Sequence, residues 1–329
     1  MFSRKMEPLK ISVIIPVKPS GAVKALGPLC TVDYPQELFE ILVAEGCRPS
    51  AQRNAAAALA SGDILYFLDD DSLVDPHFLH RVADHYLKDP AVVAVGGPSL
   101  TPEDDTLFQK SAGAVLASAF GGGGNRNRYR LVGKARQTDD AELILCNLSF
   151  RRDVFLSFGG LDERLYPNEE NELMGRLKNE GRLLIHDPSL AVMRSQRPSY
   201  RAFVKQIFGY GRGRAEQVHV SREIKVFTLA PSLFILYLLL IPVFIATPYV
   251  IPLLVYLAMD AFFSLLNGTR KGTGIACLAA VLYPTLHICY GAGFIAGLIR
   301  PRFRWSIPCA GEITIRRIKD IGRGWQSAI

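Results

Sequence analysis

Three consecutive aspartates, Asp69, Asp70 and Asp71, come directly after an apolar run of the chain. On an extended segment, side chains two positions apart point the same way, so Asp69 and Asp71 can face one ligand. Three adjacent like charges are costly unless a cation or hydrogen-bond donors neutralise them. Carboxylate oxygens suit Mg²⁺ or Mn²⁺ that carries a diphosphate, so this aspartate trio predicts a divalent metal site. A solvated acidic turn ahead of a helix is the alternative.

A pair of glutamates, Glu169 and Glu170, begins a helical stretch that reaches residue 181. Two carboxylates this close raise the pKa of one of them, and a carboxylate of raised pKa suits a general base that deprotonates a hydroxyl group. An acid-rich first helical turn, which the helix dipole favours, is the alternative, and both interpretations can hold together.

Short apolar, β-branched runs alternate with helical stretches in the first half of the chain. The runs cover residues 11–17, 39–44, 63–68 and 91–95, and the helical stretches cover residues 53–60 and 76–87. This alternation predicts a doubly wound α/β domain, whose ligands bind at the carboxyl ends of strands, where the aspartate trio lies. Residues 99–140 are less regular and predict a loop over the site. We expect Asp139 and Asp140 in a solvated loop ahead of a strand at residue 143, with contact to an acceptor substrate as the alternative.

Charge is distributed unevenly along the 329 residues, whose net charge is +7. Residues 1–193 carry 21 Lys and Arg against 26 Asp and Glu, whereas residues 194–225 carry eight basic residues against two acidic ones. Residues 226–299 hold only three charges, and residues 300–329 hold seven basic residues against two acidic ones. An acidic half joined to an apolar half with basic borders is typical of a membrane enzyme rather than a nucleic-acid binder.

The apolar half is long enough to cross a bilayer more than once. Residues 226–259 form 34 uncharged residues, which as one helix would be ~50 Å long against ~30 Å of hydrocarbon, so two spans are expected. Residues 272–299 are long enough for a third. Both basic borders should be cytoplasmic, yet three full spans would separate them. Either one apolar segment is re-entrant or interfacial, or the tail departs from the charge rule.

Several motifs together resemble the inverting family 2 glycosyltransferases of GT-A fold. The motifs are Ile15-Pro16, Glu45-Gly46, Gln52-Arg53-Asn54-Ala55, Ala60-Ser61-Gly62-Asp63, Phe67-Leu68-Asp69-Asp70-Asp71, Cys146-Asn147-Leu148-Ser149-Phe150-Arg151-Arg152, Phe158-Gly159-Gly160-Leu161-Asp162-Glu163 and Asn168-Glu169-Glu170-Asn171-Glu172. Residues 206–214 and the apolar half resemble the succinoglycan-type exopolysaccharide glycosyltransferases with C-terminal membrane helices. The resemblance implies a GT-A domain, Rossmann-like with a doubly wound mixed sheet, followed by transmembrane helices.

The resemblance also implies roles in donor binding. Pro16, Glu45 and Arg53 would line the nucleobase pocket. Asp69 and Asp70 would face the ribose and the sugar of a nucleotide-sugar donor.

Metal and catalytic roles are implied in the same way. Asp71, together with Asp69, would bind Mg²⁺ or Mn²⁺. Glu170, beside Glu169, takes the place of the family's catalytic aspartate and would deprotonate the acceptor hydroxyl as it attacks the anomeric carbon.

The sequence departs from the family pattern at three places. Glutamate replaces aspartate at Glu170 and Glu45. Residues 191–195 lack the histidine that often serves as a further metal ligand, so the metal would have fewer protein ligands. The Gln-x-x-Arg-Trp motif of processive synthases is missing after Gln206, which disfavours polymerisation. Two interpretations of this segment remain. Either Arg212 or Arg214 contacts the diphosphate, or the segment is a basic helix at the membrane surface.

These features predict a membrane-bound glycosyltransferase that acts on a lipid-linked acceptor, with its catalytic domain on the cytoplasmic side of the inner membrane. The expected parts are a GT-A domain (1–193), an interfacial segment (194–225), transmembrane helices (226–299) and a basic tail (300–329). Transfer directly to polyprenyl phosphate or to a membrane lipid is one alternative. A non-catalytic scaffold of a polysaccharide assembly complex is another.

Overall fold

The computed structural model describes residues 8–244, 248–303, 312–322, 324 and 325. A mixed sheet forms its centre, with strands in the order β11-β10-β2-β1-β3-β7-β4-β8-β6. The strands of this sheet are β1 (Ile11–Val17), β2 (Phe39–Glu45), β3 (Ile64–Leu68), β4 (Val92–Gly96), β6 (Arg136–Gln137), β7 (Asn147–Arg151), β8 (Leu183–His186), β10 (Thr314–Asp320) and β11 (Gly324–Trp325), and a separate pair contains β5 (Ser99–Leu100) and β9 (Val192–Met193). The parallel order β2-β1-β3 brings the carboxyl ends of three strands to one edge.

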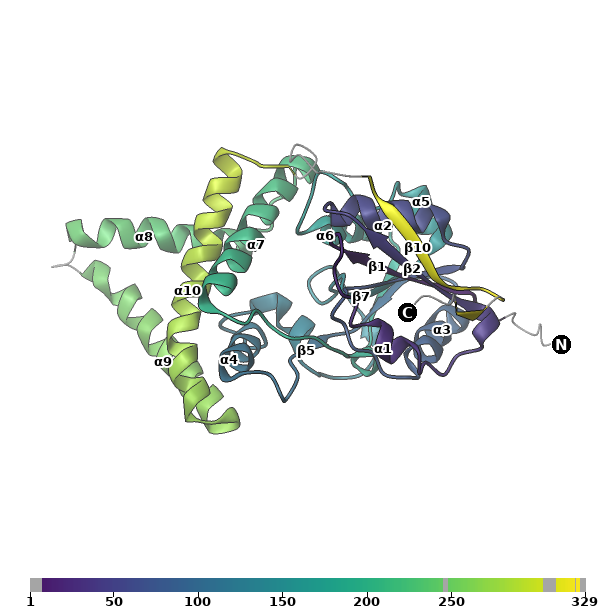
Figure 1. Ribbon diagram of the computed structural model, residues 1–329. Helices are drawn as coiled ribbons and strands as arrows, with labels where there is room; N and C mark the ends of the chain where they lie inside the picture. Colours follow the sequence, from purple (N-terminus) through teal and green to yellow (C-terminus); the bar gives the residue numbers. More distant parts are fainter. Residues whose placement is uncertain (1–7, 245–247, 304–311, 323, 326–329) are drawn as a thin grey trace.

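Helices cover both faces of the sheet and continue beyond it (Figure 1). They are α1 (Leu26–Leu29), α2 (Pro49–Leu59), α3 (Phe78–Lys88), α4 (Leu107–Leu116), α5 (Arg152–Ser157), α6 (Glu169–Asn179), α7 (Tyr200–Ser221), α8 (Ala230–Phe244), α9 (Ile251–Lys271) and α10 (Thr273–Ile299), with the 3-10 turns η1 (Gln36–Leu38), η2 (Gly123–Tyr129), η3 (Pro188–Leu190), η4 (Val226–Leu229) and η5 (Pro248–Val250).

Both faces of the central strands are buried, as their continuous apolar runs predict. Ile11, Val13 and Ile15 of β1 pack with residues of α1 and α3, whereas Ile14 packs on the opposite face with residues of α2, α5 and α6. This period of two follows from the alternation of side chains along a strand. The doubly wound α/β architecture that the sequence predicts is confirmed.

Two segments differ from the sequence-based expectation. Residues 143–146 are not a strand, and β7 begins at Asn147, which pairs with Leu68. The buried Asn147 side chain accepts a hydrogen bond from Tyr66 and donates one to the carbonyl of Leu190, which fixes the strand start. The expected loop of residues 99–140 contains helix α4, which a capping box at Thr106 begins.

The chain returns from its apolar half to complete the sheet. Strand β10 pairs antiparallel with β2, with Thr314 opposite Glu45. Lys319 is fully buried; its Nζ atom donates to the carbonyl groups of Gln36 and Phe39 and lies 4.0 Å from the centroid of the Phe39 ring. Burial lowers the pKa of Lys319, and these carbonyl groups compensate for part of its lost hydration. Part of the basic tail is therefore integral to the α/β domain.

Three helical segments among the described residues are long and apolar enough to cross a membrane: Val226–Phe244, Pro248–Lys271 and Thr273–Ile299. The first two project away from the sheet, whereas α10 runs alongside α7 (Figure 1). Glycines allow this close approach: a Cβ atom on Gly211 would lie 2.0 Å from the carbonyl oxygen of Tyr290, and one on Gly293 would lie 2.1 Å from that of Phe208. The α7–α10 contact is thus made by backbone against backbone.

Replacing Lys319 tests the role of β10. We expect Lys319→Met to lower the free energy of unfolding by about 2 kcal/mol, because two buried carbonyl groups lose their donor; the Tm would fall by roughly 5 °C. Thermal unfolding of the detergent-solubilised protein measures this. Arg316→Met on the same strand, where the side chain is 51% exposed, is the control. Equal losses in both variants would contradict a specific role for Lys319.

Candidate active site

The aspartate trio lies at the carboxyl edge of the sheet. It follows β3 directly, and the neighbouring strands β1 and β2 end at Val17 and Glu45. The carbonyl of Asp70 accepts a hydrogen bond of 3.0 Å from the backbone N–H of Ala25. This edge is where open α/β sheets bind ligands, as predicted.

Arg53 joins the aspartate trio to the glutamate pair. Its guanidinium lies 2.8 Å from Asp69 Oδ1 and 3.2 Å from Glu169 Oε1, and its side chain is only 4% exposed. The preceding residue, Gln52, donates to the carbonyl groups of Val17 and Ala44, which fixes the first turns of α2 against the strand ends. The two acidic groups, about 100 residues apart in sequence, therefore share one ion-pair network.

Arg194 neutralises the trio from the other side. Its guanidinium lies 3.0 Å from Asp69 Oδ2 and 2.7 Å from Asp71 Oδ1. Burial acts to raise the pKa of Asp69, but Arg194 and Arg53 outweigh burial and hold that pKa below its ordinary value. Burial, Asp71 and Asp69 raise the pKa of Asp70. Asp69 is thus fully committed to two arginines, and Asp71 keeps one carboxylate oxygen outside its ion pair.

Both glutamates of the pair are buried, and Glu169 is the more deeply buried of the two. It begins α6 after Asn168, whose φ of 88° turns the chain into the helix. Burial and the charge of Glu170 raise the pKa of Glu169 to about 8. Its Oε2 atom is buried and lacks a hydrogen-bond partner in the described part of the chain. The prediction that one pKa of the pair is raised is confirmed.

Glu170 faces residues that the sequence did not single out. Its Oε1 atom lies 3.9 Å from NH1 of Arg128 and 3.4 Å from the side-chain nitrogen of Asn171. Arg128 comes from η2 and is buried; it donates to the carbonyl of Ala141 at 2.8 Å and to Asn171 Oδ1 at 2.6 Å. A basic cluster at residues 126–134 was the only sequence signal for this arginine.

Other predicted site residues lie at or near the same edge. Pro16 is buried in β1 opposite Ala44. Glu45 accepts a hydrogen bond of 2.9 Å from the backbone N–H of Ser20 and lies 3.8 Å from Arg316. Neither contact tests a role in nucleobase binding.

The two arginines of α7 face different neighbours. Arg212 stacks over the ring of Phe208, 5.0 Å from its centroid. Arg214 is buried and donates to Gln217 at 2.8 Å, and its charge acts on Asp140. Asp140 is buried and ion-paired with Lys225, so it is not in solvated chain as expected. Arg128 also donates a hydrogen bond to the carbonyl of Asp140. Arg214 therefore lies on the same side of the site as Arg128 and Glu170.

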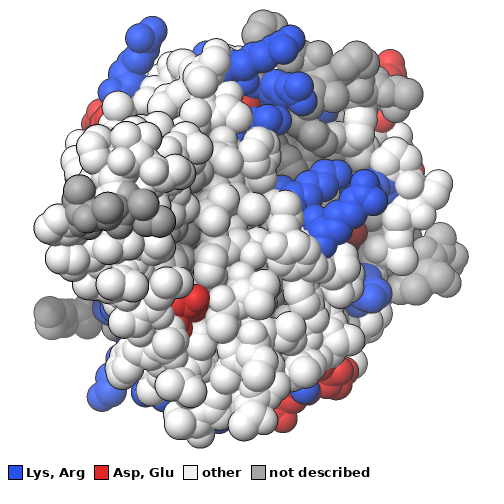
Figure 2. Space-filling model, turned by 90° about the vertical axis from the view of Figure 1, so that its left-hand side faces the viewer, with Lys and Arg blue, Asp and Glu red and all other residues white. Residues whose placement is uncertain are grey.

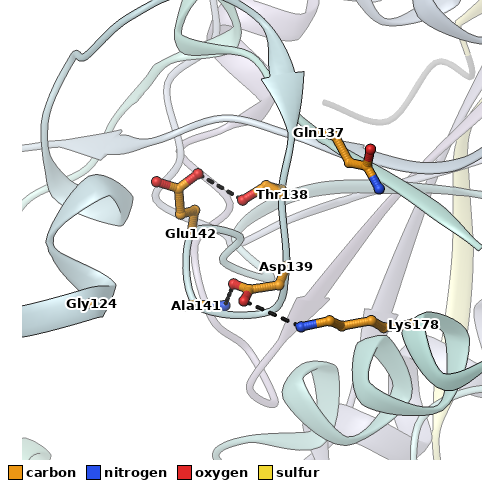
Figure 3. A pocket seen from close by; sticks show the side chains of 7 residues that line it. All are labelled: Gly124, Gln137, Thr138, Asp139, Ala141, Glu142 and Lys178. Atoms are coloured by element: carbon orange, nitrogen blue, oxygen red, sulfur yellow. Dashed lines mark hydrogen bonds and ion pairs between the residues drawn. The ribbon is translucent and has the colours of Figure 1, made fainter.

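A separate open cavity of about 560 Å³ lies between η2, residues 137–142 and α6. Gly124, Gln137, Thr138, Asp139, Ala141, Glu142 and Lys178 line it (Figure 3). Its polar side chains contact one another: Thr138 donates to Glu142 at 2.7 Å, and Lys178 lies 3.5 Å from Asp139. The trio and the glutamate pair do not line it, so the reacting groups lie elsewhere.

Among the described contacts of the trio, ion pairs occupy both oxygens of Asp69 and one oxygen of Asp71, which limits the oxygens open to a metal ion. Within the described residues there is no group of three or more His, Cys, Asp or Glu side chains arranged to hold a metal. Both oxygens of Asp69, a predicted ligand, are already ion-paired. Asp71, whose side chain is 36% exposed, retains one oxygen. Magnesium is commonly held by one or two carboxylates together with substrate phosphates, which Asp71 can satisfy.

Comparison with known proteins agrees with this architecture. Residues 33–158 match the family model described as glycosyl transferase family 2. The chain is 27% identical over 266 residues to the succinoglycan biosynthesis protein ExoA of Rhizobium meliloti (strain 1021), a match that covers 78% of this chain and 76% of that protein. It is 30% identical over 116 residues to the glucosyl-dolichyl phosphate glucuronosyltransferase of Haloferax volcanii, covering 34% of each.

Among solved structures, the chain is similar in fold to the mannosyltransferase PcManGT from Pyrobaculum calidifontis. The TM-score is 0.52 at 14% identity, with 89% of this chain and 88% of that chain covered. The trio at the carboxyl edge, the glutamate pair at the start of α6 and the matched family thus agree. Residues 33–158 form a family 2 glycosyltransferase domain within a GT-A-like fold, and the chain is a glycosyltransferase.

Proposed function

We propose that this enzyme moves a sugar from a nucleotide-sugar donor to a lipid-linked saccharide acceptor, in exopolysaccharide or other cell-surface glycan synthesis. The observation that carries the proposal is the Arg53 bridge between Asp69 and Glu169, beside apolar helices long enough to cross a membrane. The names of the similar proteins support it, since one acts in succinoglycan biosynthesis and another on glucosyl-dolichyl phosphate. The fold neighbour is described in complex with GDP-Man and Mn²⁺.

Glu170 is the general base in this proposal. An inverting transfer needs a carboxylate that takes the proton of the acceptor hydroxyl as that hydroxyl attacks the anomeric carbon. Glu169 is less available for this role, because it is the more deeply buried of the two and its Oε1 atom is ion-paired with Arg53 at 3.2 Å. Glu170 is the remaining carboxylate of the pair, and Arg128 and Asn171 orient it.

The donor diphosphate binds at the trio. Asp71 would hold Mg²⁺ or Mn²⁺ together with the diphosphate, whereas Asp69 orients Arg53 and Arg194. The cation, when bound, neutralises charge on the leaving diphosphate. Asp70, Pro16 and Glu45 remain the candidates for contact with the sugar and the nucleoside.

The catalytic domain and the tail lie on one side of the membrane. Strand β10 is hydrogen-bonded to β2, so residues 314–320 cannot be across a bilayer from the catalytic sheet. The chain must therefore cross the membrane an even number of times between residues 225 and 314. At most two of the three apolar helical segments can then cross.

Helix α10 is the one that stays at the surface. It contacts soluble elements from end to end: Gly274 lies against Leu107 of α4, Tyr200 of α7 is 3.0 Å from Thr285, and Ala215 of α7 packs against Gly297. Helix α7 carries several charged residues and cannot enter hydrocarbon. Within the most apolar window of each segment, 39% of α10 is buried against 6% and 11% of the first two segments.

Helices α8 and α9 therefore cross the membrane as a hairpin. The face that carries them is largely uncharged, and Lys and Arg gather toward its margins (Figure 2). The basic residues of 194–225 support a catalytic domain on the cytoplasmic side of the plasma membrane. A lipid-linked acceptor would then reach Glu170 along the surface helices α7 and α10.

Substitution of the proposed base tests the mechanism. We expect Glu170→Gln to lower the rate of sugar transfer by about 10²- to 10⁴-fold, because the amide cannot accept the hydroxyl proton. Donor binding, measured by calorimetry, should persist. Glu180→Gln, at the exposed end of the same helix, is the control. Unchanged turnover in Glu170→Gln would refute the assignment.

Glu169→Gln separates the two carboxyl groups. Glutamine resembles the protonated form, so transfer at pH 7 should stay within about tenfold of wild type. The folded carboxyl keeps its proton to about pH 8 and an unfolded one only to about 4.5, so the wild-type free energy of unfolding falls across that range. The variant should lack this fall in denaturation experiments at pH 5 and pH 8. Loss of transfer at pH 7 would instead make Glu169 the base.

Protease sites test the membrane arrangement. A site inserted between Phe244 and Pro248 should be cut only from the outside of intact cells, and a site after Ile329 only from the cytoplasmic side. A site after Asp104, exposed in the catalytic domain, is the control for the cytoplasmic side. Cleavage at the C-terminus from outside would contradict the two-helix hairpin.

A further inference from the structure

Arg194 is held against the aspartate trio by backbone pairing on two sides. Met193 exchanges two backbone hydrogen bonds of 2.9 Å with Leu73, two residues after the trio. Met193 also pairs with Leu100, whose carbonyl accepts the Arg194 N–H at 2.8 Å. The arginine thus directly follows the short strand β9, and its own backbone N–H is hydrogen-bonded to Leu100.

The Arg194 guanidinium contacts two carboxylates, but these contacts do not occupy all of its N–H donors. Nε lies 2.7 Å from Asp71, and NH2 lies 3.0 Å from Asp69. An arginine has five N–H donors, so other donors are available for an anion. Burial acts to lower the pKa of Arg194, but Asp69 and the other neighbouring groups hold it well above its ordinary value. The positive charge is permanent.

The charges around the trio explain why binding of a diphosphate would depend on Arg194. The trio carries three carboxylates, which alone would repel an anionic leaving group. Arg53 and Arg194 supply two compensating charges, and only Arg194 touches Asp71. Arg53 is turned inward and also binds Glu169, whereas the Arg194 side chain is 18% exposed.

We infer that Arg194 binds the donor diphosphate directly and supplies, as a fixed side chain, part of the positive charge that a divalent cation would otherwise provide. This inference rests on the proposed function and adds a diphosphate-binding residue to it. Its consequence is that a nucleoside diphosphate binds this enzyme even without a metal ion. A purely structural Arg194 would tie β9 to the trio and would leave the metal dependence of binding unchanged when replaced.

Calorimetric titration of the full-length protein in detergent with UDP and with GDP, each in Mn²⁺ and in EDTA, tests this. In the wild type we expect removal of the metal to weaken binding by no more than about tenfold, because one permanent charge remains. Arg194→Gln should weaken metal-free binding by at least a further tenfold, and Arg194→Lys should recover part of it. Arg194→His, which can ligate a metal, should bind only with Mn²⁺. Arg201→Gln, exposed on α7, is the control.

The outcomes separate this inference from the proposed function. If nucleotide binding by the wild type requires Mn²⁺, the proposed function stands and the role of Arg194 is overturned. Metal-free binding that survives in Arg194→Gln would do the same. A lower Tm in the variants with an unchanged ratio of affinities in Mn²⁺ and EDTA would assign a structural role and overturn the inference. No binding of either nucleotide under any condition would overturn both proposals.

Discussion

Five carboxylates meet at one edge of the sheet, and the site depends on how their charges are balanced. The trio follows β3 and the glutamate pair begins α6, so like charges converge where the strands end. Arginines from three distant parts of the chain make this possible: Arg53 from α2, Arg128 from η2 and Arg194 after β9. Removing one partner of such a buried pair leaves an uncompensated charge, so each arginine constrains the position of its acid.

The same ion pairs give neighbouring acidic residues different contacts. Asp69 is held by two guanidiniums, whereas Asp71 keeps an oxygen for a ligand. Burial and the charge of Glu170 raise the pKa of Glu169, whose Oε1 atom contacts Arg53, whereas Glu170 faces Arg128 at 3.9 Å. Residues of one type, adjacent in sequence, thus acquire different contacts because the helix and strand ends expose them to different partners.

Sequence patterns predicted the elements whose signals are local. The buried runs gave β1, β2 and β3 within a residue or so, and the trio and the glutamate pair stood out as acids at element ends. Side-chain partners could not be predicted in this way. The expectation that Arg53 lines a nucleobase pocket stays a prediction, whereas its ion pairs with Asp69 and Glu169 could not be foreseen from the sequence. In the sequence, the segment that contains Arg194 stands out only because it lacks a histidine. The ion pairs of Arg194 depend on the pairing of Met193 with Leu73, which no local pattern predicts.

Strand β10 could not be predicted for a related reason. Its residues alternate imperfectly between charged and apolar types, and a register shift between Arg317 and Lys319 breaks the period further. Lysine inside a strand normally indicates exposure, whereas Lys319 is buried on carbonyl groups of residues some 280 positions earlier. Only the tertiary structure creates that environment.

The placement of β10 next to β2 also sets the order of biogenesis. A ribosome releases residues 314–320 after every apolar helix has been made, so the catalytic sheet has an open edge until then. Completion of the sheet consequently follows the synthesis of the three apolar helical segments. Shortened fragments that stop before residue 226 would expose the flank of β2, and an exposed strand edge invites aggregation.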